Sequence, residues 1–221
     1  RALYAAGDFQ GALRSFRGQM RNERTALRAL AEGAGASEAV RAVHPVQLRF
    51  WVSAFQSALF NMVVTRRLQE GSFDTLLPGD VATKLRNNAQ FDVDEETLAD
   101  PETARRLETF EISPSGPLWG PKTKPASGDV AAMERTVLAR TGVTVDAIAD
   151  ASGEHGISIP GTRRAMRIPL TDPEIEGGVD DHGHYVRVAF ELPPGSFATV
   201  VMREIMKSPM TQPTDGNASD A

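Results

Sequence analysis

The chain has 221 residues, of which 41% are hydrophobic and none is cysteine. This length allows one domain or two unequal ones, and the lack of cysteine excludes disulfides, thiolate metal sites and cysteine nucleophiles. A formal net charge of −5 argues against an indiscriminate nucleic-acid binder, but residues 1–70 hold ten arginines and no lysine against five acidic residues, which leaves room for one basic face.

The first 32 residues are predicted to be helical. Residues 1–7 look like the end of a helix, so we expect polypeptide upstream of them. From residue 8 to 32 apolar residues recur at helical spacing, and Gly18 predicts a break between two shorter helices. Five arginines are spaced three or four apart; on one continuous helix they would form a track for phosphates, and a solvated helix face is the alternative. They are Arg14, Arg17, Arg21, Arg24 and Arg28.

The strongest predicted helix runs from Val46 to Glu70. It has a broad apolar face and a narrow polar stripe, which is typical of a central helix. Its uncharged stretch, Phe50 to Val64, is too short and too polar to cross a bilayer. We therefore expect a buried helix and no membrane partner.

Short strands and helices are predicted to alternate after this helix. We expect strands at residues 81–85, 90–93 and 109–112, and helices at 100–107, 130–140 and 145–149. Three prolines and two glycines fall within Ser113 to Pro121. This composition predicts a shaped loop without regular structure.

The last quarter of the chain is predicted to hold two strands and a helix. The strands are expected at residues 163–170 and 184–192, and the acidic, glycine-rich residues 172–183 are expected to form an exposed loop between them. Ser196 is placed to cap a helix that runs to about Lys207. Residues 208–221 are predicted to be disordered. The whole pattern indicates an α+β fold.

No motif for self-contained chemistry is present. Two aspartates and two histidines cluster at residues 180–184, but their spacing in a predicted turn does not suit zinc, so we predict no metal site. Nucleophile-elbow, phosphate-loop and dinucleotide fingerprints are absent. The residues alone indicate a globular α+β protein and no specific activity.

Three segments carry a longer pattern. They are Leu48 to Asn61, followed by Pro78-Gly79-Asp80; Phe110 to Gly120; and Pro194 to Glu204, with Arg163 to Arg167 as a fourth, weaker match. In this order and spacing, over roughly residues 1–207, the chain resembles the TruD family of tRNA pseudouridine synthases.

The resemblance implies a catalytic domain, an antiparallel sheet with flanking helices, that is interrupted by an insertion called the TRUD domain. By this analogy residues 1–7 end an upstream catalytic-domain helix, and residues 8–167 form the helix-rich TRUD domain. Residues 168–207 then return to the catalytic domain, and residues 208–221 form a tail.

The resemblance also implies an isomerase that converts uridine to pseudouridine, at tRNA position 13, without metal or organic cofactor. The target base must leave its stack and enter a closed pocket. The nucleophilic aspartate belongs to a Gly-x-Lys-Asp-like motif that this chain lacks and that we expect upstream of Arg1. We therefore expect a cytoplasmic monomer whose partners are tRNA and a missing N-terminal catalytic half, and an isolated chain that is inactive. A stand-alone RNA-binding or protein-interaction module is the alternative.

Within this chain the resemblance places Phe197 near the substrate pocket, together with Gly195 and Ser196. A ring exposed where a strand passes to a helix can pack beside a flipped base, and a core phenylalanine is the alternative. Candidate RNA contacts outside the N-terminal series are Arg163, Arg167 and Arg203. On a strand Arg163 and Arg167 would share one face and Arg164 would take the other, so only one set could face RNA. For Arg203 an ion pair with Glu204 is the alternative.

Overall fold

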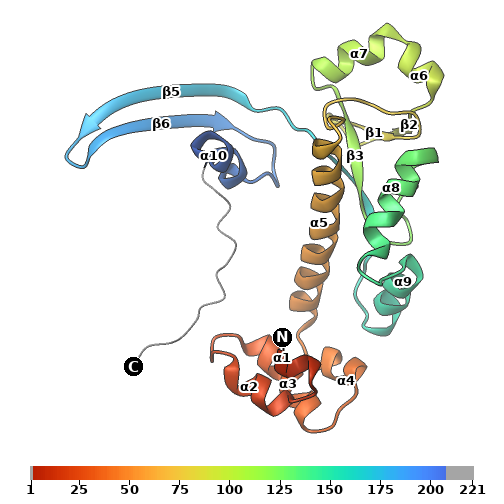
Figure 1. Ribbon diagram of the computed structural model, residues 1–221, viewed down its shortest axis with the longest axis vertical. Helices are drawn as coiled ribbons and strands as arrows, with labels where there is room; N and C mark the ends of the chain where they lie inside the picture. Colours follow the sequence, from red (N-terminus) through yellow and green to blue (C-terminus); the bar gives the residue numbers. More distant parts are fainter. Residues whose placement is uncertain (1, 208–221) are drawn as a thin grey trace. The chain divides into compact units, whose positions relative to one another are not determined.

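The computed structural model describes residues 2–207, which form two compact units. The first unit, Arg1–Arg167, contains α1–α9 and β1–β4, and the second unit, Ile168–Ala221, contains β5, β6 and α10 (Figure 1). Residues 208–221, for which disorder is predicted, lie outside the described residues.

The first unit begins with four short helices, α1 (Ala2–Ala5), α2 (Phe9–Ser15), α3 (Arg21–Ala31) and α4 (Ala36–Arg41). Asp8 caps α2 by accepting a hydrogen bond from the Gly11 amide. The predicted break near Gly18 is confirmed, because residues 16–20 separate α2 from α3. The five arginines therefore do not lie along one continuous helix, and the idea of a single straight track is wrong.

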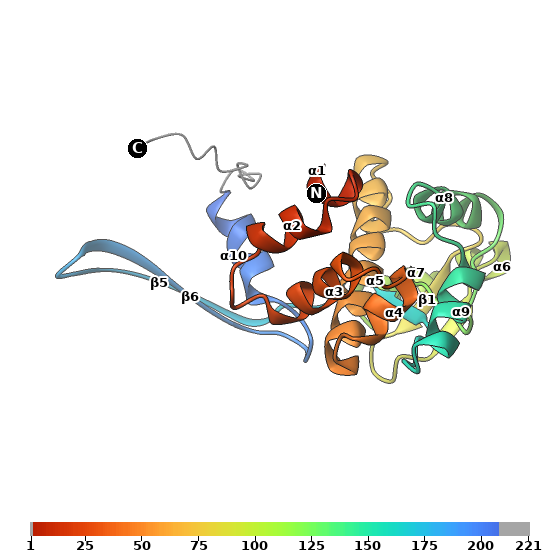
Figure 2. The ribbon, with the colours of Figure 1, turned by 90° about the horizontal axis from the view of Figure 1, so that it is seen from below.

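The long helix α5 (Pro45–Gln69) confirms the strongest helix prediction. His44 caps it through Nδ1, and Pro45 occupies the first turn, where a missing N–H is harmless. Helices α8 (Gly128–Ala139) and α9 (Val145–Glu154) lie beside α5 (Figure 1, Figure 2). Among the helices of residues 2–207, α5 included, none is long and apolar enough to cross a membrane.

Apolar side chains of α5 form two core clusters with α8 and α9. Leu59 and Val63 pack with Val137 and Leu138, whereas Leu48 packs with a cluster that includes Ile148. A third cluster lies at the sheet, next to the small helices α6 (Glu95–Ala99) and α7 (Pro101–Glu108). Asp100 caps α7 as predicted.

The sheet of the first unit has the strand order β2-β1-β3-β4, and all its pairs are antiparallel. Its strands are β1 (Val81–Lys84), β2 (Gln90–Asp92), β3 (Ile112–Leu118) and β4 (Thr162–Ala165). Strand β3 pairs with β1 through its first half and with β4 through its second half.

The prediction that residues 113–121 lack regular structure is wrong, because most of this segment is the buried strand β3. Proline cannot donate a backbone hydrogen bond, but nearby hydroxyl groups supply bonds here. Ser115 donates to the carbonyl of Val81, and Ser113 accepts from the backbone amide of Arg167 at 3.0 Å. The carbonyl of Pro114 still accepts a hydrogen bond from the Met166 amide at 2.8 Å. The serines thus make a proline-containing strand possible at the centre of the sheet.

The second unit is a long antiparallel hairpin, β5 (Thr171–Asp180) and β6 (Gly183–Glu191), followed by α10 (Ala198–Met206). The prediction of an exposed loop at residues 172–183 is wrong, since most of this segment is β5. Tyr185 pairs with Gly178 and lies across it, so the ring supplies the packing that glycine lacks. Ile175 and Val186 are 78% and 70% exposed, so this hairpin presents apolar side chains that no described residue covers.

Candidate functional site

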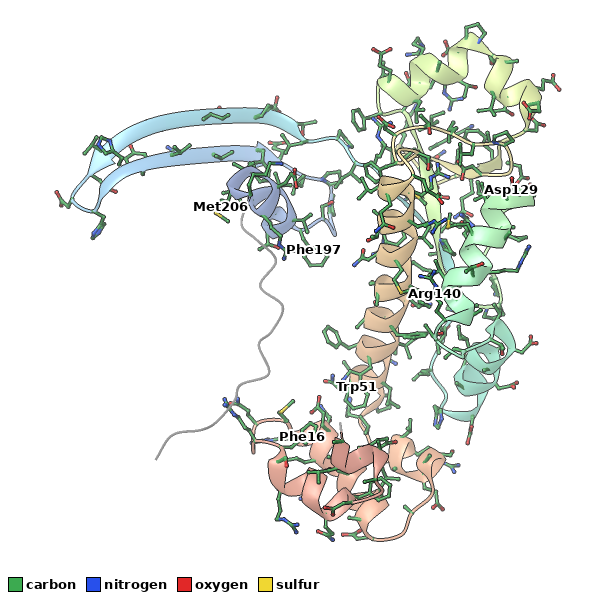
Figure 3. All side chains as sticks on the ribbon, in the orientation of Figure 1. Phe16, Trp51, Asp129, Arg140, Phe197 and Met206 are labelled. Carbon is green, nitrogen blue, oxygen red and sulfur yellow. The ribbon has the colours of Figure 1, made fainter. Side chains whose placement is uncertain are left out.

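Phe197 lies at the corner where β6 gives way to α10 (Figure 3). Gly195 turns the chain with a φ of +86°, a conformation that favours glycine. The predicted cap is displaced by one residue: Phe197, not Ser196, is the N-cap, and it makes no side-chain capping bond. The Phe197 side chain is 71% exposed. Among the described residues, Phe197 is therefore not a core phenylalanine.

An exposed phenylalanine ring can bind an apolar or planar group. Its ring costs free energy in water until another surface covers it, and its face can stack on a planar group such as a nucleobase. The corner therefore offers one aromatic wall and no reactive group.

Arg203 is exposed on α10, six residues after Phe197. The carboxylate of Glu204 pairs with Lys207 and not with Arg203. Of the two alternatives for Arg203, the ion pair with Glu204 is therefore not formed, and its charge is available for another partner.

Arg163 is buried, and its assignment as an RNA contact is wrong. All of its N–H groups are used within the first unit. Its guanidinium donates to Glu134 Oε2 at 3.2 Å and Oε1, to the carbonyl and hydroxyl of Ser115 at 2.7 and 2.9 Å, and to the carbonyl of Lys124 at 3.0 Å. Burial raises the pKa of the Glu134 carboxyl, and the guanidinium of Arg163 opposes that rise. This arginine neutralises a carboxylate inside the fold.

Arg167 is half-buried, and its guanidinium lies over the ring of Phe110, with Cζ 4.5 Å from the ring centroid. Its Nη1 also approaches the carbonyl of Asp74 at 3.4 Å. Within residues 2–207 no carboxylate lies within ion-pair distance of Arg167. An anion could therefore still bind this side chain.

Four members of the N-terminal arginine series are exposed and one is not. Arg24 is half-buried, and its Nη1 donates to the carbonyls of Leu13 and Phe16, both at 2.8 Å. These carbonyls belong to the end of α2, where backbone acceptors lack partners in the helix. Arg24 therefore joins α3 to α2, a structural role that corrects its assignment as a phosphate contact. The exposed members are Arg14, Arg17, Arg21 and Arg28.

A second buried ion pair was not expected from the sequence. Arg67 at the end of α5 binds Asp80 through two bonds of 3.0 and 3.1 Å, and both side chains are fully buried. Arg67 also donates to the carbonyls of Ser72 and Thr75, and Asp80 accepts from the Leu77 amide. Both oxygens of this buried acid are engaged, so it holds the turn after α5 and is not poised to attack a substrate.

The sequence did contain a signal for two of the missed residues. Glu134 shares a helix face with Val130, Val137 and Leu138 and is as buried as they are. A carboxylate on an apolar helix face needs a buried cation, because an unpaired buried charge is costly. Arg67 gives a similar signal, since it lies in the last turn of the apolar helix α5.

Two hollows of the first unit lie away from the predicted site residues. One, of about 370 Å³, lies between α5 and α8 and is lined by residues that include Met62, Arg66, Met133 and Arg140. Arg66 is already paired with Glu70. None of the predicted pocket or RNA-contact residues lines it.

Comparisons with known proteins agree with one another. The family model described as tRNA pseudouridine synthase D (TruD) matches residues 1–205. The tRNA pseudouridine synthase D of Syntrophotalea carbinolica is 39% identical over 206 residues, which are 93% of this chain and 48% of the relative. That of Geobacter sulfurreducens is 40% identical over 207 residues, with the same coverage of 93% and 48%.

A solved structure gives the same relation. A protein described as tRNA pseudouridine synthase D (TruD) from Methanosarcina mazei matches with a TM-score of 0.74 and 27% sequence identity. The match covers 91% of this chain and 48% of that one. The chain thus spans about half the length of these relatives.

Proposed function

The chain belongs to the TruD family of tRNA pseudouridine synthases, and we propose that it supplies the TRUD domain and the last part of the catalytic domain to a longer enzyme. The first unit ends at Arg167 and the second begins at Ile168, a boundary that supports ending the proposed TRUD domain, residues 8–167, at this point. Residues 168–207 are then the final strands and helix of the catalytic domain. The helical residues 1–7 would end an upstream catalytic-domain helix.

We infer that the longer enzyme isomerises uridine to pseudouridine in tRNA, at position 13, with an aspartate supplied by the other half of the polypeptide. The exposed ring of Phe197 carries this inference for the present chain. A flipped base needs an apolar or aromatic surface to replace the stacking that it leaves. Phe197 is that surface, with Gly195 and Ser196 forming the turn that presents it.

Exposed arginines are the proposed contacts to the tRNA backbone. Arg203 serves the second unit, and Arg14, Arg17, Arg21 and Arg28 serve the first. Exposed guanidinium groups bind phosphates through paired N–H donors and make the affinity fall with salt. Arg163 leaves this group because its N–H donors are used inside the fold, and Arg24 leaves it because its Nη1 joins α3 to α2.

The apolar side chains of the hairpin support a missing catalytic half as the partner of the second unit. A two-stranded hairpin is marginally stable alone, and contiguous exposed apolar side chains mark an interaction site. Ile175, Val179 and Val186 would be covered by that half. We expect the complete enzyme to act as a monomer in the cytoplasm.

The test compares the full-length protein with the present 221 residues. Each is incubated with a tRNA transcript, and pseudouridine is detected as a carbodiimide-dependent stop of reverse transcription. We expect a stop with the full-length protein and none with the shorter chain. If the full-length protein binds tRNA but never produces a stop, this chain is part of a non-catalytic binding module. Turnover by the 221 residues alone would refute the claim that the nucleophilic aspartate lies outside this chain.

A further inference from the structure

Arg164 differs sharply from its neighbour Arg163, although both lie on the edge strand β4. Side chains alternate along a strand, and while Arg163 turns inward to Glu134, Arg164 is exposed. Of these two arginines, the structure leaves Arg164 accessible to a ligand.

The guanidinium of Arg164 is held by an aromatic ring. Its Cζ lies 5.4 Å from the centroid of Phe60, a residue of α5 that is itself buried. Gly116 pairs with Arg164 across β3 and β4, and a Cβ at Gly116 would lie 2.9 Å from the Phe60 ring. The absence of a side chain at Gly116 therefore leaves room for Phe60. Phe60 in turn supports Arg164.

Arg167 repeats this arrangement two residues beyond the end of β4 at Ala165, where strand alternation no longer sets the side that a residue takes. Its guanidinium lies over Phe110. Three residues of extended chain span at most about 10 Å, so the Cα atoms of Arg164 and Arg167 lie within about that distance. Across the described part of the chain, neither Arg164 nor Arg167 has a carboxylate within ion-pair distance. By contrast Arg106, which lies over Phe91, also faces Glu111 at 3.6 Å.

We propose that Arg164 and Arg167 form a preorganised pair that binds the phosphodiester backbone of RNA. Contact with an aromatic ring holds a guanidinium in place without using its N–H donors, and these donors match a phosphate. Since no described carboxylate pairs with either arginine, no described residue neutralises their charges. The proposal rests on the proposed function for the class of ligand, and it adds Arg164 and Arg167 to the contacts proposed above.

The experiment measures the affinity of the full-length protein for a tRNA transcript over a series of salt concentrations. Arg164→Ala should lower the affinity about tenfold near 0.1 M salt and reduce the magnitude of the slope of log K against log salt by about 1. The double variant with Arg167→Ala should reduce the slope by about two. Arg164→Lys keeps the charge but loses the planar fork, so it should fall between wild type and Arg164→Ala.

Arg135→Ala is the matched control, because Arg135 is an exposed arginine on α8 for which no aromatic support is observed. It removes the same charge and should change the slope less than Arg164→Ala does. Equal effects of the two variants would overturn the pair as a site. An unchanged affinity together with a lower melting temperature would also overturn it, since Arg164 would then stabilise the protein itself. A wild-type protein without tRNA affinity would instead refute the proposed function.

Discussion

Arg167 is the last residue of the first unit, and its guanidinium lies over the ring of Phe110. Phe110 has a φ of 58°, in the left-handed region, where it follows the end of α7. Its amide donates to the Leu107 carbonyl, and the Glu111 amide donates to the Arg106 carbonyl at 2.9 Å. Glycine is the usual residue at such a helix end. The contact with Arg167 therefore offsets a backbone conformation that disfavours phenylalanine.

The first prediction concerns glycine and alanine at position 110. The left-handed conformation costs a non-glycine residue about 1–2 kcal/mol, and the half-buried contact between Arg167 and Phe110 contributes about 0.5–1 kcal/mol. The extra backbone freedom that glycine loses on folding costs about 0.5–1 kcal/mol. These terms nearly cancel in Phe110→Gly, so its free energy of unfolding in urea should lie within about 1 kcal/mol of wild type. Phe110→Ala loses the contact and keeps the strain, so it should be less stable than Phe110→Gly.

Ala104 provides the comparison within the same helix, because it lies inside α7 and is exposed. There Ala104→Gly should destabilise the protein by about 1 kcal/mol, the usual order of the two residues in a helix. If the alanine variant is also more stable than the glycine variant at position 110, the left-handed backbone of Phe110 does not carry the strain that this prediction assumes.

The second prediction concerns the fully buried pair of Arg67 and Asp80. Asp80→Asn removes the charge that neutralises Arg67 and should lower the free energy of unfolding by about 3–5 kcal/mol. The double replacement Arg67→Met with Asp80→Leu removes both charges, so it should cost clearly less than the sum of the two single replacements. Urea unfolding of the wild type, Arg67→Met, Asp80→Leu and the double variant measures this coupling.

The exposed pair of Arg105 and Glu102 is the control for that cycle. Solvent screens an exposed pair, so Arg105→Ala should change stability little. Additive costs at Arg67 and Asp80 would mean that their charges do not depend on each other, contrary to the geometry.

The third prediction separates Arg24 from Arg21, which are both on α3. Both replacements by alanine remove one positive charge, but only Arg24 donates to the end of α2. Arg24→Ala should therefore cost about 1–2 kcal/mol of stability more than Arg21→Ala, since two half-buried carbonyls lose a charged donor. In the full-length protein Arg21→Ala should weaken tRNA binding and flatten its salt dependence. A stability loss of the same size in both variants would contradict the structural role of Arg24.

The elements predicted well are those whose signals are local. The helix at α5 follows from its apolar periodicity, and Asp100-Pro101 correctly starts α7. Strand β3 was missed because the bonds of Ser113 and Ser115 that accommodate its prolines come from segments distant in the sequence. No local pattern contains that information.

The site was predictable only where the family resemblance, or proline and glycine residues that end a strand, indicated it. The corner at Gly195 follows from two prolines and a glycine after a strand. The alternation on β4 correctly separated Arg163 from Arg164, but it could not tell which one is buried. That depends on Glu134, which lies 29 residues away, so the choice is made by tertiary packing.

The last prediction tests the aromatic wall at Phe197 in the full-length protein. A base that stacks on a ring gains about 1–3 kcal/mol, so Phe197→Ala should lower kcat/KM for tRNA modification by roughly 10- to 100-fold. The melting temperature should hardly change, because the ring is mostly exposed. Leu68→Ala removes an apolar side chain that is 57% exposed in the first unit and should leave kcat/KM unchanged. Phe197→Tyr keeps the ring and should retain most of the activity, whereas full turnover by Phe197→Ala would show that the flipped base stacks on some other residue.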